Sequence, residues 1–327
     1  MGMRPLKFRE ILKPTLWGGT DITAMKSLTA SGASIGESWE ISGVPGAETP
    51  VAGGEYAGMT LRELTARFGA ELVGAENLRR YGDNFPLLVK FISAARDLSI
   101  QVHPDNAMAR RLGRPFGKSE MWYIVRARRG AMICSGFNHE FAPADFTRSL
   151  DEGTLCNHLR QHESRAGDCF FIPAGRIHSI GAGNFLIEVQ QSSDDTFRVY
   201  DFNRVDQNGE RRQLHVDLAR EALDYEYADD NRTNYLPVVN RAVTLIDRPE
   251  FTTRLYQLDR PLRADYSAID SFVIFVAFEG SARLIDGDGN AVSLRAGESV
   301  LFPASNGTVE LMPGDAHPFG CLECFIR

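Results

Sequence analysis

Two short motifs carry residue types that can do chemistry. The stretch LSIQVHPDN places Gln101 and His103 two residues apart, so the side-chain period of a strand puts both on one face. The pattern G-x5-P-x-G-x2-H runs from Gly167 to His178. A strand that ends at its Pro–Ala–Gly turn reverses the chain, and we expect His178 to open the next strand with its side chain directed inward.

Together with a carboxylate, these residues form a set of metal ligands. Glu120 begins the strand MWYIV and joins two imidazoles and an amide oxygen. A mixed nitrogen and oxygen set of this kind suits Zn²⁺ with an open position for water or substrate, and Fe²⁺, Co²⁺ and Mn²⁺ also accept it. We therefore predict one metal ion per chain, Zn²⁺ in the first place, held by Gln101, His103, Glu120 and His178.

Short strands separated by Gly, Pro, Asn and Asp must position these ligands. The pattern predicts strands at 38–42, 86–92, 98–103, 121–126, 131–135, 169–172, 185–191, 272–278, 281–286, 292–294, 299–302 and 321–326. So many short strands are typical of a β-sandwich or barrel. Helices are predicted at 60–68, where Thr60 and Glu63 form a capping box, and at 71–80, 144–151 and 217–224.

A weak internal repeat divides the chain. EMWYIVRARRG resembles DSFVIFVAFEG, with Glu120 matching Asp270. GDCFFIPAGRIH resembles GESVLFPASNGT, with Thr308 in the place of His178. Only the first copy keeps groups that can hold a metal.

The repeat suggests two related β-domains joined by a linker. We expect a metal-binding catalytic domain with helical insertions over residues 1–225. The polar segment 226–241 contains a proline and lacks periodicity, so we interpret it as a linker. Residues 242–327 would then form a degenerate, metal-free β-domain.

Composition and charge argue against two classes of partner, nucleic acids and membranes. The 327 residues carry a net charge of −7, which argues against general nucleic-acid binding. No apolar run is long enough to span a bilayer, and the first residues lack the apolar core of a signal peptide. Five cysteines without a framework fit a reducing compartment. We therefore predict a cytoplasmic protein with neither a nucleic acid nor a membrane as partner.

Taken together, the motifs resemble a known family. G-x5-P-x-G-x2-H is similar to the second half of the cupin signature, although Q-x-H stands where cupins usually have H-x-H. The combination of LSIQVHPDN, GKSEMWYIV, GDCFFIPAGRIHSIGAG and SSDDTFRVYDFNRVD resembles the type I phosphomannose isomerases, as do LWGGT and GESWEIS. The resemblance covers residues 5–225 strongly and the rest loosely. It implies an all-β fold of two cupin-type jelly-roll domains with a few helical insertions, and interconversion of mannose 6-phosphate and fructose 6-phosphate.

The resemblance also implies individual roles. The four predicted ligands match the family's metal ligands. Lys118 and Arg198 match catalytic residues, and both, together with Asp194, match residues that bind the substrate. The partner implied is a phosphorylated sugar, and the protein would act as a monomer or homodimer.

The residues are suited to that chemistry. An aldose–ketose isomerisation moves a proton between C2 and C1 through a cis-enediol, so it needs an electrophile and an acid/base. A metal supplies the first, and Arg198 or Lys118 can stabilise the same charge or bind phosphate. The proton could be moved by a metal-bound water, Lys118, Asp194 or Glu188. Arg198 could alternatively be a structural pair for Asp201 or Asp194.

Two other functions compete with this interpretation. A cupin dioxygenase needs three histidines, a glutamate and a redox metal, whereas a glutamine takes one place here. A non-catalytic cupin sensor of sugar phosphates would bind the sugar without turnover. Such sensors usually attach a helix-turn-helix, and no segment of the sequence has that pattern.

Overall fold

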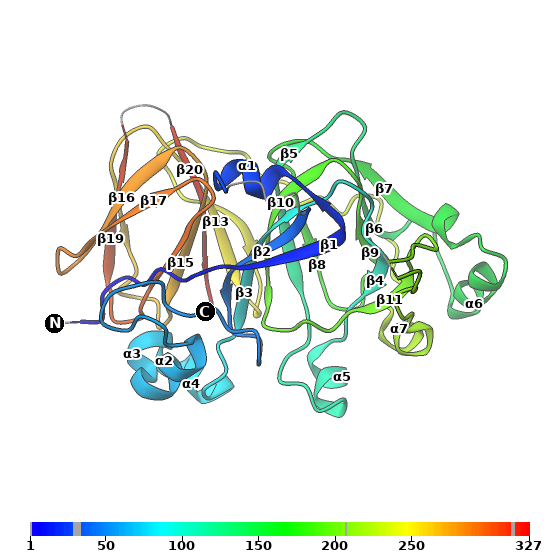
Figure 1. The fold of residues 1–327 in the computed structure, drawn as a ribbon, viewed down its shortest axis with the longest axis horizontal. Helices are drawn as coiled ribbons and strands as arrows, with labels where there is room; N and C mark the ends of the chain where they lie inside the picture. The colour runs from blue at the N-terminus through cyan, green and yellow to red at the C-terminus, as the bar shows by residue number, and fades with distance from the viewer. Residues whose placement is uncertain (1, 29–33, 207, 315–317) are drawn as a thin grey trace.

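Antiparallel β-strands are the main regular structure of the chain (Figure 1). The computed structural model describes residues 2–28, 34–206, 208–314 and 318–327. The strands in the first part of the chain are β1 (Ile11–Gly19), β2 (Ile35–Ser42), β3 (Leu87–Ser93), β4 (Ile100–Val102), β5 (Glu120–Ala127), β6 (Met132–Phe137), β7 (Leu159–Glu163), β8 (Cys169–Ile172), β9 (His178–Ile180), β10 (Asn184–Gln191) and β11 (Phe197–Tyr200). Those in the second part are β12 (Val243–Asp247), β13 (Thr252–Leu258), β14 (Leu262–Asp265), β15 (Val273–Glu279), β16 (Ser281–Asp286), β17 (Ala291–Arg295), β18 (Ser299–Phe302), β19 (Thr308–Pro313) and β20 (Phe319–Phe325).

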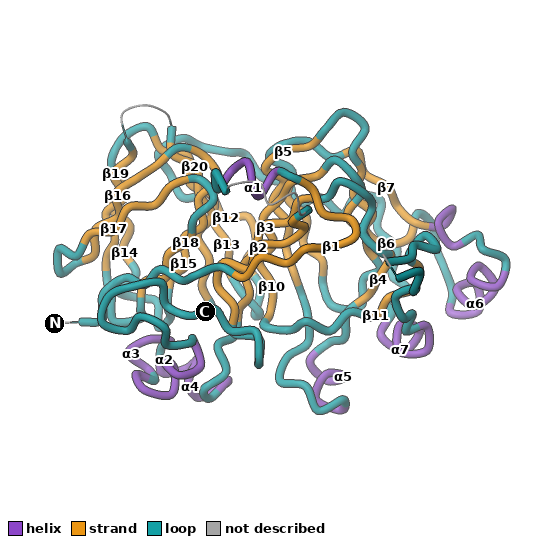
Figure 2. Tube along the Cα trace, viewed as in Figure 1, coloured by secondary structure: helices purple, strands orange, loops and turns teal. Residues whose placement is uncertain are grey.

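Short helices lie at the periphery of the strands (Figure 2). They are α1 (Asp21–Met25), α2 (Leu61–Phe68), α3 (Ala70–Val73), α4 (Ala75–Tyr81), α5 (Asn106–Arg111), α6 (Pro143–Asp151), the 3-10 helix η1 (Leu155–His158) and α7 (Val216–Ala222). The expected all-β class with a few helical insertions is confirmed. No helix in the described part of the chain is both long and apolar enough to cross a membrane.

The strands form two sandwiches that lie side by side (Figure 1). The first packs a six-stranded sheet, ordered β1-β2-β3-β10-β5-β8, on a five-stranded sheet, ordered β11-β4-β9-β6-β7. The second packs β12-β13-β20-β15-β18 on β14-β19-β16-β17. The six-stranded sheet is covered on both faces, because its other side packs against the second sandwich.

This double burial explains the apolar strands of the six-stranded sheet. Every residue of β10 is buried, and alternate side chains enter different cores. Leu186 lies inside the first sandwich, whereas Phe185 and Ile187 lie between the two sandwiches. Two separate segments, which contain α6 and α7, cover the outer side of the first sandwich, where Phe146 and Ala219 pack.

The strand order reproduces the internal repeat. Strands β2 to β10 of the first sandwich recur as β12 to β20 in the same neighbour order, with β1 and β11 added. The match of Glu120 to Asp270 is wrong by three residues. Glu120 pairs with Ile172, and the residue in the same register of the second copy is Val273, which pairs with Phe302. Asp270 instead caps α4, because its carboxylate accepts hydrogen bonds from the first backbone amides of that helix.

One charge pair occurs in both copies, with both partners buried in the first copy and the basic residue 20% exposed in the second. In each sandwich a glutamate sits between a basic residue and an aromatic residue on the neighbouring strands. The two rows are Lys90–Glu188–Trp122 and Arg254–Glu323–Phe275.

Two further predictions concern a helix and the domain boundaries. The single helix predicted at 71–80 is wrong, because Gly74 separates α3 from α4 with φ +93°. A Cβ on Gly74 would lie 2.1 Å from the Asp270 carbonyl oxygen, so this position requires glycine. The predicted domain boundaries, with a first domain ending at residue 225 and a linker ending at residue 241, stay a prediction. Leu6, in the predicted first domain, pairs with Leu301 of the second sandwich.

Candidate metal centre and substrate pocket

Three of the predicted ligands meet inside the first sandwich. One ligating atom each of His103, Glu120 and His178 lies within 4.8 Å of the other two. The three side chains are at most 1% exposed. Strand register places Gln101 beside His178 of this cluster and Arg198 beside Gln101. The three residues are direct partners across β11, β4 and β9. Side chains of directly paired residues stand next to one another on one face of a sheet.

Both imidazoles turn the same nitrogen toward the cluster. Nδ1 of His103 lies 2.8 Å from the Asp195 carbonyl oxygen, and Nδ1 of His178 lies 2.8 Å from that of Arg176. A carbonyl can only accept, so each Nδ1 carries the proton and each Nε2 presents a lone pair. Burial, followed by the charge of Lys118, lowers the pKa of His103 to about 3, and burial also lowers the pKa of His178. Both rings are therefore neutral near pH 7, as metal ligands must be.

Glu120 faces these lone pairs with an unsatisfied carboxylate. Both of its oxygens are buried and accept no hydrogen bond from the described residues. Burial alone would raise the pKa of Glu120, but the charge of Lys118, whose Nζ lies 3.1 Å from Oε2, holds it well below its usual value. A buried carboxylate without hydrogen bonds beside two lone pairs is the environment that a divalent cation satisfies, so the set fits a metal ion.

Gln101 lies at the edge of the same cluster. Its Nε2 is 3.4 Å from Nε2 of His178, while its Oε1 accepts a hydrogen bond from Ser99. A half-turn of the amide would exchange the two atoms and bring the oxygen toward the cluster. The geometry therefore leaves the glutamine able to act as a fourth ligand.

A polar pocket of about 420 Å³ opens next to the cluster. Gln101 and Lys118 line this pocket and also contact His178 and His103, so these two side chains connect the pocket to the cluster. The remaining charged and polar residues of its lining include Thr15, Glu37, Lys90, Ser99, Glu188, Asp194, Asp195, Arg198, Arg212 and His215. Asp194 and Arg198, two residues predicted from the sequence to bind substrate, therefore both face this space.

Arg198 offers a positive charge without a carboxylate partner. Among the described residues it forms no ion pair; its Nη1 donates to the Gln213 carbonyl, and its buried Nε has no acceptor. Asp201, the expected alternative partner, binds Arg204 and Arg212 instead. Burial, followed by the charge of Arg212, lowers the pKa of Arg198. Two guanidinium groups beside one end of the pocket suit an anionic group of the ligand.

Sequence reasoning missed Lys90. It lines the pocket from β3 of the six-stranded sheet, whereas Arg198 lines it from β11 of the five-stranded sheet. Its Nζ lies 2.8 Å from Glu188 Oε1, and Trp122 donates to the other oxygen at 2.7 Å. Burial would lower the pKa of Lys90, but Glu188 and Glu37 raise it, so the side chain is charged. The available signal was a lysine inside the apolar strand LLVKFIS, because a lysine is rarely buried without a partner.

Comparisons with known proteins show which family the chain resembles. The model of the phosphomannose isomerase type I catalytic domain matches residues 6–132. Mannose-6-phosphate isomerase ManA of Bacillus subtilis is 31% identical over 329 residues, which cover 100% of this chain and 99% of that relative. Mannose-6-phosphate isomerase of Streptococcus mutans is 32% identical over 301 residues, covering 91% and 92%.

A solved structure extends the similarity to the fold. The crystal structure of the mannose 6-phosphate isomerase from Bacillus subtilis matches with a TM-score of 0.87 and 28% identity over 99% of this chain and 100% of that one. The resemblance found in the motifs is therefore confirmed along the length of the chain. This chain belongs to the type I mannose-6-phosphate isomerase family.

Proposed function

We propose that the protein interconverts mannose 6-phosphate and fructose 6-phosphate. The observation that carries this proposal is one polar pocket lined by Gln101 and Lys118, which contact the His103–Glu120–His178 cluster, and by Arg198, which has no carboxylate partner among the described residues. Such a pocket has an electrophilic end for the sugar oxygens and a cationic end for the phosphate.

The ligand cluster is proposed to hold one divalent ion. Gln101, His103, Glu120 and His178 would bind Zn²⁺, and the same donors accept Fe²⁺, Co²⁺ or Mn²⁺. Such an ion would supply a Lewis acid that stabilises negative charge developing on the sugar oxygens.

The other end of the pocket is proposed to bind the phosphate. The guanidinium of Arg198 can donate two parallel hydrogen bonds to a phosphate. Arg212, which Asp201 holds through two short contacts, adds positive charge nearby. Asp194 lines the same space and can accept hydrogen bonds from sugar hydroxyl groups.

Lys118 is the residue that we propose to move the proton. Its Nζ lies 3.1 Å from both Glu120 and His103, and its side chain reaches the pocket. In its uncharged amine form, after it gives up the proton that pairs it with Glu120, it would take the proton from C2 and return it to C1, while the O2 hydroxyl proton passes to O1 through the cis-enediol. Asp194 and Glu188 remain alternatives, but Glu188 is already engaged by Lys90 and Trp122.

Turnover by the purified protein tests the proposal. Conversion of mannose 6-phosphate should stop after chelation, return when Zn²⁺ is added, and be absent in His178→Ala. His162→Ala is the matched control, because His162 is buried but lies outside the cluster. Lys118→Met should keep the bound metal yet stop exchange of the C2 proton with deuterated water.

The competing functions predict other results. Binding of mannose 6-phosphate by metal-loaded protein without turnover would contradict the isomerase and support a sensor. Oxygen consumption that requires Fe²⁺ would support a dioxygenase. The cytoplasmic location and the choice between monomer and homodimer stay predictions.

A further inference from the structure

A bulge in the edge strand β1 forms one wall of the substrate pocket. Pro14 and Gly19 both pair with Ile35 of β2, so residues 15–18 bulge out of the ladder. Two residues of this bulge, Thr15 and Trp17, line the pocket. On the side of β3, the Trp17 carbonyl accepts hydrogen bonds from the backbone amides of residues 95 and 96. The position of this wall therefore depends on what holds the chain on either side of it.

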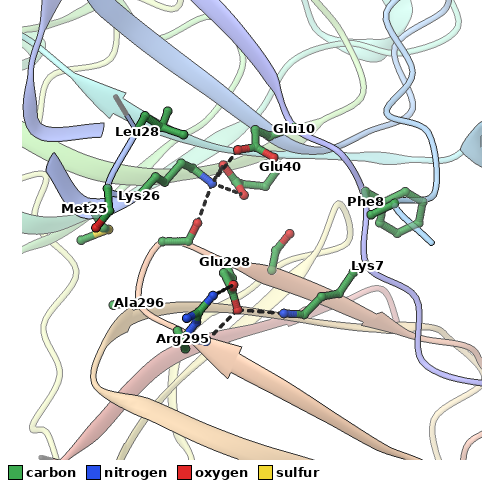
Figure 3. Close-up of a pocket in the computed structure, with 14 residues that line it drawn as sticks. Lys7, Phe8, Glu10, Met25, Lys26, Leu28, Glu40, Arg295, Ala296 and Glu298 are labelled. Carbon is green, nitrogen blue, oxygen red and sulfur yellow. Dashed lines mark hydrogen bonds and ion pairs between the residues drawn. The ribbon is translucent and has the colours of Figure 1, made fainter. Parts of the chain in front are cut away.

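Beyond the bulge, the chain is fastened to both sandwiches: Asp21, the first residue of α1, accepts a hydrogen bond from Ser93 of β3, and Lys26 at the other end reaches the second sandwich. Helix α1 follows immediately, and Lys26 caps its end. The Nζ of Lys26 donates to the Gly297 carbonyl at 2.6 Å and lies 2.9 Å from the carboxylate of Glu40 on β2 (Figure 3). The Lys26 and Glu40 side chains are 9% and 4% exposed. One ammonium group thus joins α1, the first sandwich and the turn that precedes β18.

The backbone at Gly297 is shaped for this contact. Its φ is +86°, and a Cβ there would lie 2.9 Å from Met25 Cγ. Glycine is therefore required both by the dihedral angle and by the close approach of α1. The contact lines a pocket of about 400 Å³ between the sandwiches, where a second ion pair joins Lys7 to Glu298 at 2.8 Å (Figure 3).

We infer that the Lys26–Gly297 contact lets the second sandwich position the Thr15–Trp17 wall of the substrate pocket. Lys26 is thus a positioning residue, and it acts through α1 and the bulge. An edge strand is held by a ladder on one side only, so contacts outside that ladder, here the two hydrogen bonds to the Trp17 carbonyl and the anchoring of α1, set the position of a bulge within it. The inference rests on the proposed function, because the wall matters only if the pocket takes the sugar phosphate.

Lys26→Met compared with Lys7→Met tests the inference. Both variants remove a lysine that reaches the β17–β18 turn, but only Lys26 follows the bulge. Hydrogen exchange of the peptide covering residues 15–19 should rise in Lys26→Met and stay at the wild-type level in Lys7→Met. The KM for mannose 6-phosphate should rise about tenfold in Lys26→Met, with a smaller change in kcat.

Two glycine substitutions in the second sandwich, at Gly297 and Gly289, test the same inference. Gly297→Ala should reproduce the Lys26→Met pattern. Gly289→Ala, at φ +84° and with no atom within 4 Å of its Cβ, should cost stability without changing exchange at residues 15–19. Unchanged exchange in Lys26→Met, or raised exchange with an unchanged KM, would overturn the inference. Wild-type turnover checks the proposed function separately, and the Kd for mannose 6-phosphate replaces KM if turnover is absent.

Discussion

Replacing Lys90 by methionine removes the positive charge from a buried pair. The Lys90 and Glu188 side chains are 6% and 4% exposed, and the ammonium also lies 3.6 Å from Glu37. Removing one partner of such a pair leaves a buried charge without compensation, which costs about 3–5 kcal/mol. Lys7→Met is the control, because the Lys7 and Glu298 side chains are 32% and 28% exposed, and exposed pairs contribute at most about 1 kcal/mol.

The loss should depend on pH in a defined direction. Burial, followed by the charge of Glu120, raises the pKa of Glu188 above its usual 4.5. In Lys90→Met the carboxylate is therefore charged and unpaired in the folded state at high pH. Below pH 4.5 it is protonated in both the folded and the unfolded state. The full loss should appear near pH 8 and shrink as the pH falls toward 4.5.

Denaturant unfolding followed by tryptophan fluorescence measures this loss, because Trp122 contacts Glu188 directly. The double variant Lys90→Met/Glu188→Gln should recover most of the free energy of unfolding, since it leaves no charge in the pair. A loss below about 1 kcal/mol near pH 8, or a loss that grows on acidification, would refute the reasoning.

Three further perturbations probe other parts of the chain. Burial raises the pKa of Glu40 from 4.5 to about 7, so the folded state holds this proton more tightly and its unfolding free energy falls as pH rises through that window. Between pH 4.5 and 8, Glu40→Gln should therefore gain about 3 kcal/mol relative to wild type in pH-dependent denaturation. Arg198→Met should raise the KM for mannose 6-phosphate about 10- to 100-fold with the metal content unchanged; an unchanged KM would remove it from phosphate binding. Asp270→Ala should lower the free energy of unfolding by about 1 kcal/mol, because α4 loses its N-terminal cap, and an unchanged thermal midpoint would contradict this.

The sequence was sufficient for the elements whose pattern is local. Strands such as β8 and β10 and the capped helix α2 were predicted within a few residues, because apolar runs and a capping box are short-range signals. The cluster was accessible for the same reason, since the Q-x-H pair and the G-x5-P-x-G-x2-H turn each occupy one short segment.

Features that depend on long-range contacts were missed. Strand β1 contains Pro14 and a four-residue bulge, so its sequence has no period of two. The break between α3 and α4 comes from the close approach of Asp270, nearly two hundred residues away. The role of Lys90 in the pocket depends on a glutamate of another strand. Likewise, only the hydrogen-bonded ladder shows that Val273 and not Asp270 corresponds to Glu120.

The recurrence of one charge pair in both sandwiches gives the chain its own internal control. Arg254 and Glu323 occupy the register of Lys90 and Glu188, but Val273 and Thr308 stand where the first copy has Glu120 and His178. The contribution of such a pair to the free energy of unfolding can thus be measured in the same molecule at a place that has no ligand cluster beside it. Comparing the loss of unfolding free energy in Arg254→Met with that in Lys90→Met shows how this pair affects stability with and without the ligand cluster beside it.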